Sequence, residues 1–188
     1  MRTITLPNLL TMLRILSVPL FIIFFKTDIK VATVIFVSAM ITDVLDGIIA
    51  RINKSRSILG SILDPLADKI LIDTAFLLLA SVVLMPYWMV VTIISRDVIL
   101  ILGWLLIFIV TSKTEVEPSI FGKLTNFLQS TSVLLLLFSL ICKTSYTLHQ
   151  CQIINISEKV LDIYLYIMVI FTIISLLDYL IKGIKRLG

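Results

Sequence analysis

Residues 43–68 read DVLDGIIARINKSRSILGSILDPLAD, which is the pattern D-x-x-D-G-x-x-A-R-x8-G-x3-D-x3-D. The fixed positions are Asp43, Asp46, Gly47, Ala50, Arg51, Gly60, Asp64 and Asp68, and Lys69 follows at once. An Asp within a bilayer costs about 2.5–3.5 kcal/mol on insertion scales. Four carboxylates between apolar residues therefore need something that offsets their charge.

The first half of the pattern has helical spacing. Asp43, Asp46, Gly47 and Ala50 stand at i, i+3, i+4 and i+7, which is one face of an α-helix. Small residues beside the two acids would let a bulky ligand approach the backbone. This half therefore predicts a ligand-binding helix face.

The second half repeats the arrangement. Gly60, Asp64 and Asp68 stand at i, i+4 and i+8. Pro65 disfavours helical geometry at the preceding residue and is best tolerated in a first helical turn. We therefore expect the third helix to begin near Asp64, with Gly60 in its approach.

The surrounding composition is that of an integral membrane protein. The 188 residues are 59% apolar and 15% charged, and the mean hydropathy is +1.12. A helix needs about 17–25 apolar residues to cross a hydrocarbon core of about 30 Å. Six such stretches predict an all-α protein of one domain, residues 1–188, with six transmembrane helices near 9–25, 32–50, 61–84, 88–111, 124–142 and 160–181.

The distribution of Lys and Arg predicts the orientation, because cytoplasmic loops are enriched in them. Four lie in loops on one side, namely Lys26, Lys30, Lys143 and Lys159. Nine lie on the other side: Arg2, Arg51, Lys54, Arg56, Lys113, Lys123, Lys182, Lys185 and Arg186. Both termini and a polar metal-binding cavity are thus expected at the cytoplasm. The basic residues at the C-terminal end, Lys182, Lys185 and Arg186, are expected to set the topology and to contact anionic lipid, so no nucleic-acid partner is expected.

A divalent cation is the simplest ligand for the four acids. Carboxylate oxygens suit Mg²⁺ or Mn²⁺, and two such ions could clamp a pyrophosphate and stabilise the attacking and leaving oxygens. The alternative is that the acids are solvated helix ends or ion-paired structural charges. The grouping of four acids with Gly47, Ala50 and Arg51 favours the metal site.

The complete pattern resembles the signature of the CDP-alcohol phosphatidyltransferases without a departure. The opening Leu6-Pro7-Asn8-x-x-Thr11-x-x-Arg14 is similar to that of phosphatidylglycerophosphate synthases and CMP-forming cardiolipin synthases. Residues 63–69, LDPLADK, look like the same subgroup. The resemblance implies transfer of a phosphatidyl group from CDP-diacylglycerol to a glycerol-type hydroxyl, with release of CMP, in a bacterial-type inner membrane.

The resemblance also implies roles for individual residues. Asp43, Asp46, Asp64 and Asp68 would surround two metal ions, and Asp68 would be the general base. The CDP moiety would bind at Gly47, Ala50, Arg51 and Gly60. Family members are similar in being homodimers, with one cytoplasm-facing cavity in each protomer.

The acceptor depends on residues that lie mostly outside the pattern. Lys69, Arg96 and Lys123 are candidate cationic donors for an acceptor phosphate. Alternatively, Arg96 and Asp97 neutralise each other or neighbouring helices. Phosphatidylglycerophosphate synthases usually have Arg-Glu here, whereas Ser95-Arg96-Asp97-Val98 resembles cardiolipin synthases. Glycerol-3-phosphate and phosphatidylglycerol both stay open, and the first is favoured as the commoner acceptor among short bacterial-type members.

Two other classes of membrane protein use intramembrane acids. A transporter would show paired repeats or broken helices in matching halves, but all the diagnostic acids here lie in one window. Membrane prenyltransferases of the aromatic type resemble nine-helix proteins with two widely separated Asp motifs, and this chain is too short for that. The enzyme interpretation is therefore preferred to both.

Overall fold

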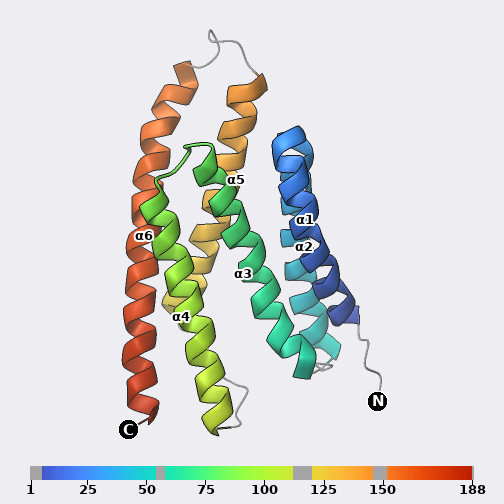
Figure 1. Ribbon diagram of the computed structural model, residues 1–188, viewed down its shortest axis with the longest axis vertical. Helices are drawn as coiled ribbons and strands as arrows, with labels where there is room; N and C mark the ends of the chain where they lie inside the picture. Colours follow the sequence, from blue (N-terminus) through green and yellow to red (C-terminus); the bar gives the residue numbers. More distant parts are fainter. Residues whose placement is uncertain (1–5, 54–57, 112–119, 146–151, 188) are drawn as a thin grey trace. The chain divides into compact units, whose positions relative to one another are not determined.

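The computed structural model describes residues 6–53, 58–111, 120–145 and 152–187. Side chains are described for residues 11–43, 66–103, 105, 120–144 and 159–182. Within these ranges the protein is all-α (Figure 1), as predicted. The helices are α1 (Leu6–Thr27), α2 (Ile29–Asn53), α3 (Ile58–Ser81), α4 (Tyr87–Thr111), α5 (Ile120–Ser145) and α6 (Gln152–Leu187).

Each apolar stretch of the sequence coincides with one of these helices. The shortest helix, α1, has 22 residues, which at about 1.5 Å per residue is enough to cross a hydrocarbon core. Among the described residues, Ile120–Thr144 and Lys159–Lys182 are long and apolar enough to span a membrane, with mean hydropathies of 1.7 and 2.4. The helical prediction is thus confirmed, and parts of α5 and α6 have the length and composition of membrane spans.

The expected start of the third helix was wrong. Helix α3 begins at Ile58, so Gly60 lies inside it and Pro65 is not in its first turn. The proline removes one N–H from the helical hydrogen-bond ladder, but the apolar residues on both sides continue the helix. Prolines are tolerated in transmembrane helices where the surroundings satisfy the freed carbonyl. Gly60, Asp64 and Asp68 therefore belong to one continuous helix.

The chain forms two compact units, Met1–Leu78 and Leu79–Gly188. The first unit holds α1, α2 and most of α3, and with them all four acids of the motif. The second unit holds α4, α5 and α6, and α6 packs against both α4 and α5.

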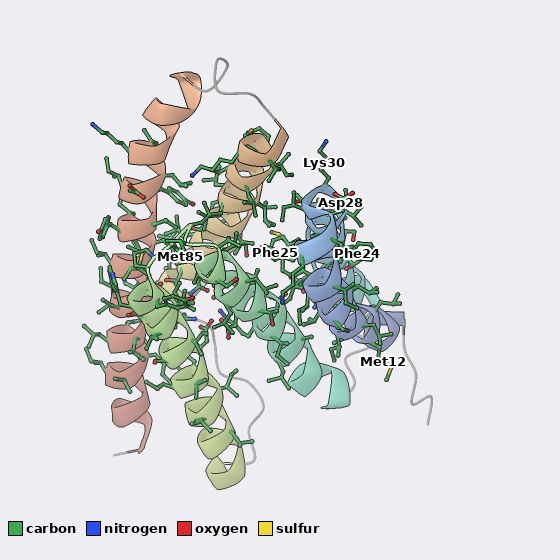
Figure 2. The ribbon with its side chains drawn as sticks, turned by 45° about the horizontal axis from the view of Figure 1, so that its top comes forward. Met12, Phe24, Phe25, Asp28, Lys30 and Met85 are labelled. Carbon is green, nitrogen blue, oxygen red and sulfur yellow. The ribbon has the colours of Figure 1, made fainter. Side chains whose placement is uncertain are left out.

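Helices α1 and α2 form a hairpin with a one-residue break at Asp28. The Asp28 carboxylate accepts hydrogen bonds from the backbone N–H of Lys30 (2.9 Å) and of Val31 (3.4 Å). This is N-capping, because the carboxylate satisfies N–H groups in the first turn of α2 that have no helical partner. Figure 2 labels Asp28 and Lys30 at this end of the hairpin. The cap reverses the chain and lays α2 along α1.

Aromatic packing holds the hairpin together. The rings of Phe21 and Phe36 lie 5.7 Å apart between centroids, and those of Phe21 and Phe25 lie 5.8 Å apart. All three side chains are buried. Burial of a Phe side chain stabilises by about 1.5–3 kcal/mol, so these contacts set how the two helices lie against each other.

In the second unit α4 and α6 approach closely at Gly103. A Cβ placed on Gly103 would lie 2.8 Å from the Tyr179 Oη atom. The Tyr179 hydroxyl also lies 3.5 Å from the Leu100 carbonyl oxygen, to which it donates. The missing side chain at residue 103 is therefore what makes room for the tyrosine ring of α6.

Candidate functional site

The motif acids of two helices meet at one arginine. The Arg14 Nη1 atom of α1 lies 2.9 Å from Asp43 Oδ1 of α2 and 3.9 Å from Asp68 Oδ1 of α3. The Arg14 side chain is fully buried, whereas each of the two carboxylates is 37% exposed. The two halves of the sequence motif therefore converge within the first unit on one buried cation, and both carboxylates stay partly exposed.

The helix faces explain this convergence. Among the described side chains of α1, the buried ones are Thr11, Arg14, Val18, Phe21 and Phe25, which recur every three or four positions. Such spacing places Arg14 on the same face as the phenylalanines that pack the hairpin.

Asp43 is positioned in the same way on α2. Ala32, Phe36 and Ala39 are buried at successive turns, and Asp43 follows four residues later on the same face. Because the hairpin brings this face onto α1, the Asp43 carboxylate reaches the Arg14 guanidinium. Apolar packing along the hairpin thus brings one polar contact into place.

The remaining motif residues are placed by their helices. Asp46, Gly47, Ala50 and Arg51 lie in α2, which is helical without interruption from Ile29 to Asn53, so the expected shared face of Asp43, Asp46, Gly47 and Ala50 follows from helix geometry. Gly60 and Asp64 lie in α3, two turns and one turn before Asp68. The side chains of these positions are outside the described residues.

The geometry of Asp43 and Asp68 fits a two-metal centre. Two ions about 4 Å apart with metal–oxygen bonds of about 2 Å span at most about 8 Å between their outermost ligand oxygens. The distances of both carboxylates to the same Nη1 atom keep their Oδ1 atoms within that span. Among the residues whose side chains are described, no group of three potential metal ligands occurs. The other two motif acids, Asp46 and Asp64, lie outside that set.

Sequence reasoning did not select Arg14 as a site residue. Arg14 belongs to the opening motif and no role at the site was predicted for it, although an arginine inside an apolar run is a functional signal by itself. Its register with Thr11 and Val18 would have placed it on the packed face of α1. Which acids it meets depends on how the helices pack.

A small hollow borders Arg14 between α1 and α2. Its volume is about 90 Å³, and it is lined by Leu13, Arg14, Ser17, Ser38, Ala39 and Thr42. The three hydroxyl groups donate to helix carbonyls, for example Ser17 Oγ to the Arg14 carbonyl at 2.6 Å. Arg14 is therefore bordered by polar groups of both helices.

Lys69 and Lys123 are placed in different units. Lys69 is half-buried on α3 beside Asp68, in the first unit. Lys123 is exposed in the first turn of α5, in the second unit. Of the three candidate acceptor-binding cations, Lys69 is the one that shares a unit with the acids.

Arg96 lies in a buried polar cluster of the second unit. Its Nη1 donates to Asp97 Oδ1 and lies 3.5 Å from Asn126 Oδ1 of α5, and its Nη2 donates to Ser175 Oγ of α6 at 2.7 Å. Arg96 and Asp97 are 2% and 1% exposed. These contacts agree with the interpretation that Arg96 and Asp97 neutralise each other, and they tie α4 to both α5 and α6.

The second unit contains further buried hydroxyl and amide groups. Thr125, Gln129 and Ser132 of α5 and Thr172 of α6 are buried with Arg96 and Ser175. Thr125 Oγ1 donates to the Phe171 carbonyl at 3.1 Å, across the contact of α5 with α6. Because unpaired polar groups are costly in an apolar interior, such cross-helix contacts fix how these helices lie.

Comparison with known proteins adds independent findings. A family model described as CDP-alcohol phosphatidyltransferase matches residues 4–174. A probable phosphatidylglycerophosphate synthase of Mycobacterium tuberculosis is 30% identical over 195 residues, covering 100% of this chain and 85% of the relative. A CDP-diacylglycerol--glycerol-3-phosphate 3-phosphatidyltransferase of Bacillus subtilis is 31% identical, covering 97% and 96%.

A human CMP-forming cardiolipin synthase is also similar. It is 42% identical over 124 residues, which are 65% of this chain and 40% of the human protein. The names of these relatives specify different products or acceptors. Together with the uninterrupted motif and its convergence on two helices, these matches show that the chain belongs to the CDP-alcohol phosphatidyltransferase family.

Proposed function

We propose that this protein transfers the phosphatidyl group of CDP-diacylglycerol to glycerol-3-phosphate, releasing CMP and forming phosphatidylglycerophosphate. The observation that carries the proposal is the meeting of Asp43 and Asp68 at Arg14, which gathers both halves of the family motif in one place. The relatives matched along almost their whole length, from Mycobacterium and Bacillus, have names that specify this type of product or acceptor.

The chemistry assigned to the chain's own residues is proton transfer and substrate orientation. Asp68 takes the proton of the acceptor hydroxyl, while the hydroxyl oxygen forms a bond to the phosphorus that carries diacylglycerol. The bond from this phosphorus to the bridging oxygen of the CDP group breaks, and CMP leaves with the electron pair. Gly47, Ala50 and Gly60 leave space for the nucleotide, and Arg51 pairs with phosphate oxygens.

A divalent metal is part of the proposal. Enzymes of this family generally depend on a divalent metal, and we assign two Mg²⁺ or Mn²⁺ ions to Asp43, Asp46, Asp64 and Asp68. When bound, the ions would stabilise the charge on the attacking and leaving oxygens. The 37% exposure of Asp43 and Asp68 supports this assignment, because ions and phosphate can reach the carboxylates from solvent.

The proposed setting is a membrane crossed by all of the helices, with both termini and the acidic centre at the cytoplasmic side of a bacterial-type inner membrane. Its supports are the helix lengths and the excess of Lys and Arg on that side. We also assign a homodimer with one site in each protomer, as implied by the family resemblance.

Phosphatidylglycerol is the second candidate acceptor, which would make the protein a CMP-forming cardiolipin synthase. Two observations favour it: the 42% identity to the human enzyme over 124 residues, and the sequence Ser95-Arg96-Asp97-Val98. A transporter with an intramembrane acidic site is the alternative of a different class, and the family match argues against it.

A CMP-release assay tests the proposal. Purified protein in detergent is given CDP-diacylglycerol and Mg²⁺ with either radiolabelled glycerol-3-phosphate or phosphatidylglycerol. We expect CMP and labelled phosphatidylglycerophosphate with the first acceptor, and at least a thousandfold slower turnover for Asp68→Asn, since general-base catalysis and metal coordination are both impaired.

Asp162→Asn serves as the matched control, because Asp162 is an exposed acid outside the motif. It should retain wild-type turnover. If CMP is released with phosphatidylglycerol but not with glycerol-3-phosphate, the protein is a CMP-forming cardiolipin synthase. No CMP from either acceptor, or an active Asp68→Asn variant, would contradict the proposed mechanism.

A further inference from the structure

Arg14 lies where a cation is needed by both halves of the acidic motif. One of its nitrogen atoms contacts Asp43 and Asp68, which come from different helices. The guanidinium is fully buried and the carboxylates are partly exposed, so the arginine contacts them from the protein side. Metal ions would approach the same carboxylates from the other, solvent side.

The electrostatic balance gives this arrangement a consequence. A buried guanidinium costs several kcal/mol in desolvation unless acids compensate it. Nearby carboxylates in turn repel one another unless a cation lies between them. Before any metal binds, the contacts of Arg14 with Asp43 and Asp68 reduce both the desolvation cost of the guanidinium and the repulsion between the carboxylates.

We propose that Arg14 is a positioning residue that acts as the built-in counter-cation of the acidic centre. It holds Asp43 of α2 and Asp68 of α3 together in the metal-free protein and then competes with the divalent ions for the same carboxylates. The inference deepens the proposed function, because it rests on the metal centre assigned there.

Two opposite effects follow from removing this charge. The metal-free protein loses the cation that joins α2 to α3, so it should unfold at a lower temperature. The centre becomes more negative by one unit, so divalent ions should bind more tightly. For charges a few ångströms apart in a water-like dielectric, the second effect is about tenfold in Kd. A residue that merely filled space would lower stability without tightening metal binding.

The experiment uses the full chain in detergent, stripped of metal with EDTA. Thermal unfolding is followed over a titration with MnCl2, and free Mn²⁺ is measured by electron paramagnetic resonance. For Arg14→Met, which keeps the apolar stem, we expect a lower unfolding temperature without Mn²⁺, a larger rise on adding it, and a Kd about tenfold lower than wild type.

Lys26→Met is the matched control, since it removes an exposed cation at the other end of α1. It should match wild type in unfolding temperature and in Mn²⁺ affinity. Arg14→Lys is the second variant, in case Arg14→Met fails to accumulate. It keeps the charge but not the guanidinium reach, so it should have near wild-type Mn²⁺ affinity and an intermediate metal-free stability.

An equal fall in unfolding temperature with and without Mn²⁺, together with an unchanged Kd, would overturn the inference. If wild-type protein binds no Mn²⁺ at all, the metal centre itself fails. The role of Arg14 is then decided without metal by a double-mutant cycle. Asp43→Asn should lower the unfolding temperature in wild type but much less in Arg14→Met, and additive effects would reject the pairing.

Discussion

At the scale of single residues, two buried arginines of this protein contact carboxylates on neighbouring helices or at a neighbouring position. Arg14 contacts Asp43 and Asp68, and Arg96 contacts Asp97. The exposure of the partners differs. The acids beside Arg14 are partly exposed, whereas Arg96 and Asp97 are both buried. The contacts of Arg14 are thus suited to exchange with a ligand, and those of Arg96 to fixing helix positions.

A prediction about Arg96 follows from its burial. Arg96→Met leaves Asp97 buried without its cation, so it should lower stability by about 3–5 kcal/mol, the usual cost of removing one partner of a buried pair. Arg96→Met/Asp97→Leu removes both charges and should recover most of that loss in thermal unfolding. Lys182→Met, at an exposed i,i+4 pair with Asp178, is the control and should change stability by less than about 0.5 kcal/mol.

The same double variant addresses the acceptor. If Arg96 serves structure alone, the folded double variant should keep the wild-type KM for glycerol-3-phosphate. A KM raised tenfold or more with little change in kcat would instead assign Arg96 to the acceptor phosphate.

At the scale of elements, the end of α3 contains a local conflict. The Leu84 N–H donates to the Leu79 carbonyl (3.2 Å) and the Val83 N–H to the Ala80 carbonyl (3.0 Å), which is the hydrogen-bond pattern of a Schellman C-cap. Val83 occupies the left-handed position of this cap, with a φ of 60°. Glycine is favoured there, because a β-branched residue with positive φ is strained.

Replacing this valine should therefore stabilise the protein. We expect Val83→Gly to raise stability by about 1 kcal/mol, measured by thermal unfolding in detergent, because the strain disappears and the side chain is 87% exposed and has little packing to lose. Val82→Gly is the matched control beside it, and should be neutral or destabilising. A destabilised Val83→Gly would mean that the valine side chain contributes more than its backbone costs.

At the scale of the whole molecule, the charge distribution predicts a topology. Lys26 belongs to the side with four loop cations and Lys182 to the side with nine. We expect single cysteines at these two exposed positions, in a Cys142→Ala/Cys151→Ala background, to react differently with a membrane-impermeant maleimide on intact cells. Lys26→Cys should be labelled, and Lys182→Cys only after the cells are opened. Labelling of Lys182→Cys on intact cells would contradict the predicted topology, in which the C-terminal end and the acidic centre face the cytoplasm.

Much of the protein could be predicted from sequence, and particular residues show where prediction stopped. The apolar stretches predicted every helix in the described chain to within a few residues at most ends, because burial in lipid imposes length and composition locally. The start of α3 was predicted six residues too late. The prediction used the usual preference of proline for the first helical turn, but the apolar residues on both sides of Pro65 continue the helix. The contacts between helices could not be predicted, because they do not follow from the sequence of each helix by itself.

The sequence by itself determined the family, the helical class and the four acids at helical spacing, because motif spacing and hydropathy are properties of short segments. Only the tertiary structure decided that Arg14 contacts both Asp43 and Asp68, and that Arg96 is joined to Asp97 and Ser175. The physical reason is that a charge inside an apolar interior takes whichever partner packing brings within reach. That choice depends on how distant helices lie against one another.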